Sequence, residues 1–85
     1  MKKENLSVLA YANGFTLWHY RTTAASEYIE AYGYFSKAGN MLRVGDIILV
    51  QASDKIFQVA CVEVINQNEV VMATMASTPQ TTERG

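Results

Sequence analysis

The single histidine is the only imidazole with which this 85-residue chain could perform general-base catalysis. His19 lies in Leu17-Trp18-His19-Tyr20, a run rich in strand-forming residues. Catalysis of the serine–histidine kind needs a base beside the nucleophile, and often a strained turn that presents the nucleophile. No serine of the chain stands in the sequence of such a turn. The pattern favours a structural or interface role for His19, and neither a catalytic residue nor an enzymatic activity is expected.

Metal ions and cofactors are not expected either. One His, one Cys and two Asp do not supply the ligands of a familiar zinc site, and the carboxylates lack the dense spacing of a calcium loop. The glycines stand singly, so no phosphate-binding loop is indicated. Asp46, which follows Gly45, is interpreted as a turn former. Cys61, the only cysteine, is interpreted as a small core residue.

Aromatic side chains are the main candidates for binding. Eight of the nine lie between Tyr11 and Phe35. Rings on a sheet can stack on single-stranded bases, or they can anchor a protein interface, where Trp, Tyr and Arg are favoured. Stacking on nucleic acid normally comes with a basic groove, whereas here 7 Lys and Arg are dispersed among 8 Asp and Glu, for a net charge of −1. The composition therefore favours a protein partner, and nucleic acid is not an expected partner.

These aromatic residues must be positioned first of all by a hairpin. Asn13-Gly14 is flanked by residues 6–12 and 15–22, both rich in strand formers, and this dipeptide tolerates the positive φ angles of a type I′ turn. In the second strand Phe15, Leu17 and His19 point to one face, and the intervening residues point to the other. Neither face is plainly polar, which predicts a central strand or one that something else covers.

The rest of the chain predicts a short helix and a three-stranded meander. Residues 31–38 are expected to be helical, because apolar residues recur there at helical spacing. Residues 47–75 are expected to form three antiparallel strands. The predicted fold is mainly β, a small antiparallel barrel or sandwich of about five or six strands with one short helix. We expect an N-terminal arm over residues 1–5, one domain over 6–76 and a flexible tail over 77–85.

The apolar residues divide into an expected core and an expected interface. The core is predicted to contain Ile47, Leu49, Val59, Cys61, Val62, Val64 and Val71. The interface is predicted to contain Tyr11, Phe15, Trp18, Tyr20, Arg21, Tyr32, Tyr34, Phe35 and Arg43. Because several strands are apolar on both faces, the sequence does not separate core from interface more finely.

The run from Asn5 to Thr22, followed by Gly33-Tyr34-Phe35 and by residues 41–46, resembles a group of small proteins from tailed bacteriophages and prophages. The resemblance covers roughly the first 50 residues. It implies a virion component, such as a capsid-decorating or cement protein or a small head–tail or fibre-associated protein. It carries over no catalytic residue.

The resulting hypothesis is a non-enzymatic structural protein of a phage particle. It would be made in the host cytoplasm and would then lie on the capsid surface, bound to the major capsid protein or another virion protein and to sibling copies as a homo-oligomer. Membrane association is not expected, because the longest apolar run is far shorter than the ~20 residues that span a bilayer. The alternative is a small SH3- or OB-like module that binds single-stranded nucleic acid or a host protein. A small enzyme that uses His19 is the third possibility.

Overall fold

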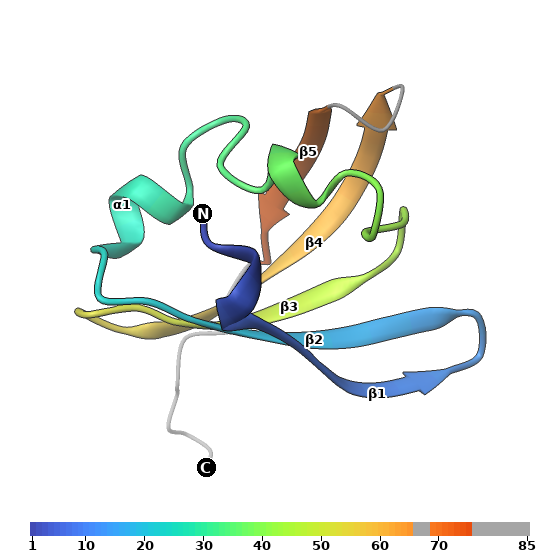
Figure 1. Ribbon diagram of the computed structural model, residues 1–85, viewed down its shortest axis with the longest axis horizontal. Helices are drawn as coiled ribbons and strands as arrows, with labels where there is room; N and C mark the ends of the chain where they lie inside the picture. The colour runs from blue at the N-terminus through green and yellow to red at the C-terminus, as the bar shows by residue number, and fades with distance from the viewer. Residues whose placement is uncertain (66–68, 76–85) are drawn as a thin grey trace, which may run out of the picture.

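The computed structural model describes residues 1–65 and 69–75 of the chain. These residues form one five-stranded sheet with strand order β1-β2-β3-β4-β5 and three short helical segments (Figure 1). The elements in chain order are η1 (Lys3–Asn5), β1 (Leu6–Ala12), β2 (Phe15–Arg21), α1 (Ser26–Ile29), η2 (Ser36–Ala38), β3 (Ile47–Gln51), β4 (Ile56–Ile65) and β5 (Glu69–Thr74). The predicted mainly β fold with a short helix is confirmed, although the sheet does not close into a barrel.

The hairpin expected at Asn13-Gly14 is present. Asn13 has a φ of 53° and Gly14 a φ of 82°, as a type I′ turn requires. Strands β1 and β2 pair in antiparallel fashion from this turn, with one irregularity between Val8 and Ala10 that leaves Leu9 as an extra residue. Such a bulge bends the strand and strengthens its twist.

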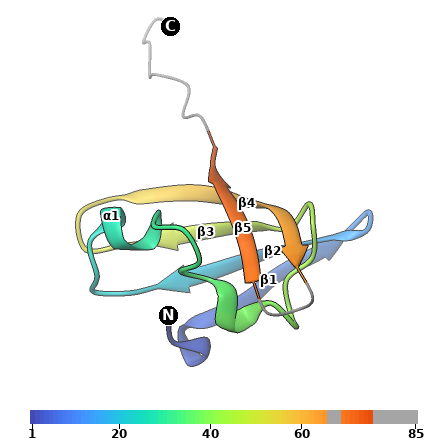
Figure 2. The same cartoon turned by 90° about the horizontal axis from the view of Figure 1, so that it is seen from above.

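The sheet is mixed, and this corrects the expectation of a wholly antiparallel one. Strands β2 and β3 are parallel, with Trp18 opposite Ile48 and Tyr20 opposite Val50. A parallel pair needs a long crossover, because the chain must return to the same end of the sheet. Residues 22–46 provide it, and they carry α1 and η2 over one face, as Figure 2 shows from above. Strands β3, β4 and β5 form the predicted antiparallel meander.

The helix lies earlier than predicted. It is α1, Ser26–Ile29, and residues 31–38 contain turns that end in the single 3-10 turn η2. Gly33 has a φ of 81°, a left-handed conformation that interrupts a right-handed helix. Phe35, Ala38 and Leu42 are nevertheless all buried, which for Phe35 corrects the predicted place at an interface. Among the described residues, none of the helices is long and apolar enough to cross a membrane.

A single core lies between the crossover and the face of the sheet that it covers. Of the predicted core residues, Val59 and Cys61 are buried there. Ile47 and Leu49 are not, because the covered face holds the alternate residues Ile48 and Val50. The remaining differences lie in β4 and β5. There, Val62 is exposed beside a register shift in β4, Val64 is half-buried at the edge of the core, and Val70 takes the buried place predicted for Val71.

The expected N-terminal arm is packed against the domain. Residues 3–5 form η1, and Met1 is partly buried against the core. The backbone N–H of Lys2 donates a hydrogen bond to Oη of Tyr20 at 3.1 Å. The first residues therefore complete the covered side of the sheet. The predicted tail over residues 77–85 lies outside the described residues.

Candidate functional site

The predicted interface residues fall into two groups that the sequence could not separate. Three are core residues: Trp18 is 7% exposed, and Tyr20 and Phe35 are each 1% exposed. They lie on the face that the crossover covers, so the expectation that they form an outer surface is corrected for these three. The others reach the surface. Tyr11 and Tyr32 are 70% and 72% exposed, Arg21 and Arg43 are exposed, and Phe15 and Tyr34 are half-buried.

Trp18 is held inside by a carboxylate. Its Nε1 donates a hydrogen bond of 3.0 Å to Oδ2 of Asp46, which is itself 3% exposed. The same carboxylate accepts the backbone N–H groups of Thr16 at 3.0 Å and Arg43 at 3.1 Å. The turn that Asp46 was expected to form is present, with Gly45 at a φ of 98°. The long-range role of the carboxylate was missed, and the indole N–H, which needs an acceptor when it is buried, was its only signal in the sequence.

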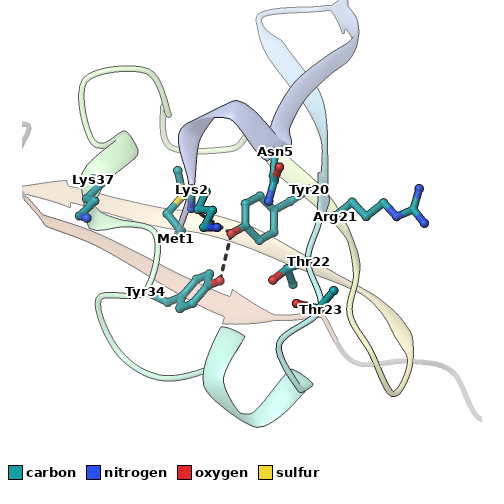
Figure 3. Close-up of a pocket in the computed structure, with 9 residues that line it drawn as sticks. All are labelled: Met1, Lys2, Asn5, Tyr20, Arg21, Thr22, Thr23, Tyr34 and Lys37. Carbon is teal, nitrogen blue, oxygen red and sulfur yellow. Dashed lines mark hydrogen bonds between the residues drawn. The ribbon is translucent and has the colours of Figure 1, made fainter.

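Tyr20, Tyr34 and Phe35 form a ring cluster under the crossover. The three rings meet edge to face, with centroids 5.1 to 6.0 Å apart. The hydroxyls of Tyr20 and Tyr34 lie 3.0 Å apart in a mutual hydrogen bond (Figure 3). Burial raises the pKa of Tyr34 to about 12, and the bond to Tyr20 adds to this shift. Tyr34 therefore holds its phenolic proton more tightly than an exposed tyrosine does.

The opposite face of the sheet, which we call the open face, carries apolar side chains among polar ones and no helix of the described chain (Figure 1). Leu17, Ile47 and Ala60 form one row across β2, β3 and β4, because Ile47 pairs with both of the others. Leu49 lies in the next row, between His19 and Gln58. These apolar side chains are half-buried, and none belongs to the core cluster. The central strands were predicted to be apolar on both faces. One of these faces lies in the core, and the other is the open face.

Strand β1 lies at the edge of the sheet. Val8 and Tyr11, which the register pairs with Trp18 and Thr16, lie on the covered side of this strand and not on the open face. The strand pairs only with β2, and six of its seven residues are exposed. Val8 and Leu9 are 57% and 53% exposed, in addition to Tyr11. An edge strand with free backbone groups and exposed apolar side chains is a template for pairing with another chain. Native proteins usually protect such an edge with charge, yet β1 contains no charged residue.

A hollow opens beside the tyrosine pair, on the covered side of the sheet. Its volume is about 680 Å³, and Figure 3 shows the residues that line it. They come from the first residues of the chain, the end of β2, the start of the crossover and η2: Met1, Lys2, Asn5, Tyr20, Arg21, Thr22, Thr23, Tyr34 and Lys37. Tyr34, another predicted interface residue, thus lies here and not on the open face. Arg21 also lines the hollow, but its side chain extends away from Tyr34 (Figure 3).

The chemically reactive side chains do not gather in one place. His19 is half-buried on the open face, opposite Leu49 of β3. Cys61 is buried in the core, where burial raises the pKa of its thiol and the charge of Asp46 adds to the shift. Within residues 1–65 and 69–75, no group of three or more His, Cys, Asp or Glu side chains is placed to hold a metal ion.

Comparisons of the chain with known protein families, with curated proteins and with solved structures found no match.

Proposed function

We propose that this protein is a non-enzymatic structural component of a phage particle, and that it binds the capsid through its open face and the edge strand β1. The partners are the major capsid protein or another virion protein, together with sibling copies of the chain. The resemblance of residues 5–46 to small phage proteins supports the virion assignment. The open face is the single observation that carries the docking assignment.

The physical argument is one of uncovered apolar surface. Phe15, Leu17, Ile47 and Leu49 project from adjacent strands on a face that none of the described residues cover. Transfer of apolar surface out of water is favourable by about 25 cal/mol per Å². Extended apolar patches of this kind mark interaction sites in small soluble proteins. A partner that covers this face gives the sheet the second layer that its sequence predicts.

The edge of β1 fits the same function. A strand from a neighbouring chain can add to an exposed edge through backbone hydrogen bonds, and side-chain contacts then supply specificity. Val8, Leu9 and Tyr11 offer such contacts. The edge of β1 borders both sides of the sheet, so a strand added there can contact Val8 and Tyr11 on the covered side and also continue the open face.

The alternative function, binding of single-stranded nucleic acid, depended mainly on stacking of bases on Trp18. Stacking requires an accessible aromatic face. Trp18 is buried and bonded to Asp46, and the open face is mostly aliphatic. The ring on which this alternative depends is thus not accessible for stacking, so we do not propose it.

Mass spectrometry of purified virions tests the virion assignment, and absence of the protein from particles contradicts it. A binding experiment with purified particles tests the docking face. Leu49→Lys places a charge on the open face and is expected to abolish binding while the fold is retained. Tyr28→Ser is the matched control, because Tyr28 is exposed on α1, on the covered side. Equal binding by both variants would rule out the open face as the docking surface.

A further inference from the structure

The wall of the hollow beside the tyrosine pair is rich in hydroxyl groups. Tyr20, Tyr34, Thr22 and Thr23 bring four hydroxyl groups to its wall (Figure 3). Two of them receive backbone N–H donors: Lys2 N–H donates to Tyr20 Oη at 3.1 Å, and Ala24 N–H donates to Thr22 Oγ1 at 3.1 Å. Four hydroxyl groups have four protons to donate, but a row of four hydroxyls makes at most three hydrogen bonds among its own members. At least one O–H therefore lacks an acceptor within the group.

The same hollow is lined by positive charge. Lys2, Arg21 and Lys37 contribute three of the seven Lys and Arg of the chain, and neither Asp nor Glu is among the lining residues. In Figure 3, Lys2 lies beside the tyrosine pair and Lys37 stands on one side of it, whereas the side chain of Arg21, on the other side, extends away from the pair. The three cations are exposed, so their long side chains are free to turn toward a ligand. The near-neutral composition of the chain conceals this local excess.

We propose that this hollow binds a phosphate group. A ligand that fits must accept hydrogen bonds from hydroxyls and balance several cations at once. A phosphate carries about −1.5 to −2 charges near neutral pH and presents several strong acceptor oxygens. Arg and Lys make their strongest hydrogen bonds with such anions. Metal cations do not fit, because no carboxylate lines the hollow.

The test is a titration of the protein with inorganic phosphate, followed by amide chemical shifts at constant ionic strength. Saturable shifts are expected at Lys2, Thr22 and Ala24. Lys37→Ala, and separately Tyr34→Phe, are expected to weaken the affinity by roughly tenfold. Lys55→Ala is the matched control. Like Lys37→Ala it removes one positive charge, but Lys55 lies over Phe57 and does not line the hollow. The control is expected to leave the affinity unchanged.

Three further titrations complete the experiment. Sodium chloride replaces phosphate in the first, as a control for ionic strength. A nucleoside monophosphate and a short oligothymidylate are the ligands in the other two. Tighter binding of either nucleotide ligand than of inorganic phosphate supports the site and identifies the source of the phosphate. Equal affinities support free phosphate. Shifts that chloride reproduces, shifts that do not saturate, or equal losses in Lys37→Ala and Lys55→Ala overturn the proposal. Leu49→Lys, which tests the open face, is expected to bind phosphate normally, so the two proposals can fail separately.

Discussion

The carboxylate of Asp46 accepts a hydrogen bond from the indole N–H of Trp18 across a distance of 3.0 Å, and both side chains are buried. Asp46 directly precedes β3, and Trp18 lies in the middle of β2. The bond thus joins the two parallel strands at the end of their crossover. The backbone N–H of Cys61 also donates to the carbonyl oxygen of Asp46 at 2.8 Å, so this residue connects three neighbouring strands.

Replacement of Asp46 by Ala is expected to lower the free energy of unfolding by about 3 kcal/mol. The substitution leaves three N–H donors without their acceptor, and the indole N–H is buried. Urea unfolding followed by tryptophan fluorescence measures the change. Asp54→Ala is the control, because Asp54 also accepts a backbone N–H but is exposed, and its loss is expected to cost less. Equal effects of the two substitutions would contradict the role assigned to Asp46.

A second prediction concerns stability in acid. Ser26 donates both its hydroxyl and its backbone N–H to Asp54, at 2.7 and 2.8 Å, and these bonds lower the pKa of Asp54 below its usual 3.8. Because the folded-state pKa is depressed, the stabilisation is fully present above pH 3.8 and is lost as the pH falls through the folded-state value. The difference in unfolding free energy between wild type and Asp54→Ala should therefore be constant from neutral pH down to pH 3.8 and then shrink. A difference that stays constant down to the lowest accessible pH contradicts this prediction.

The tyrosine pair predicts the opposite behaviour in alkali. The pKa of Tyr34 is raised from 10.0 to about 12, so the folded state holds this proton more tightly than the unfolded state. The associated stabilisation is present below pH 10 and is lost as the pH rises toward 12. The absorbance difference at the phenolate band between wild type and Tyr34→Phe isolates this ionisation. A midpoint near 10 would show that Tyr34 is not shielded in the way the structure indicates.

Local signals in the sequence were sufficient for the hairpin and the meander. Asn13-Gly14 requires positive φ at both positions, and few other arrangements use this dipeptide between two strand-forming runs. The parallel pairing of β2 with β3 has no comparable local signal, since it depends on how residues 22–46 pack over the sheet. The helix was displaced for a related reason, because the backbone conformation of Gly33 overrides the helical spacing of its neighbours.

The candidate site was harder to predict because both faces of the central strands are apolar. In Ile47–Gln51 the alternation shows that Ile48 and Val50 share a face, but it does not show which face the crossover covers. Trp18 and Tyr20 were placed at an interface for the same reason. The burial of Asp46 and its bond to Trp18 were not predicted, because Gly-Asp before a strand is already explained by a turn. The hollow joins residues from separate elements, which no linear pattern brings together.

The final prediction uses two adjacent residues of β3 that face opposite ways. Ile48 is buried in the core, whereas Leu49 is half-buried on the open face. Ile48→Lys places an unpaired charge in the core and is expected to unfold the protein, at a cost of more than about 4 kcal/mol. Leu49→Lys is expected to cost about 1 kcal/mol or less, because its ammonium group remains in water.

Light scattering over a range of protein concentrations then separates folding from association. If sibling copies bind through the open face, wild type should form oligomers, and Leu49→Lys should remain monomeric with an unchanged circular dichroism spectrum. The added charge acts on the interface because a buried, unpaired ammonium group is costly to desolvate. Oligomers of Leu49→Lys as stable as those of wild type would place the contact between copies elsewhere, and the exposed edge of β1 would then be the next surface to alter, by Val8→Lys.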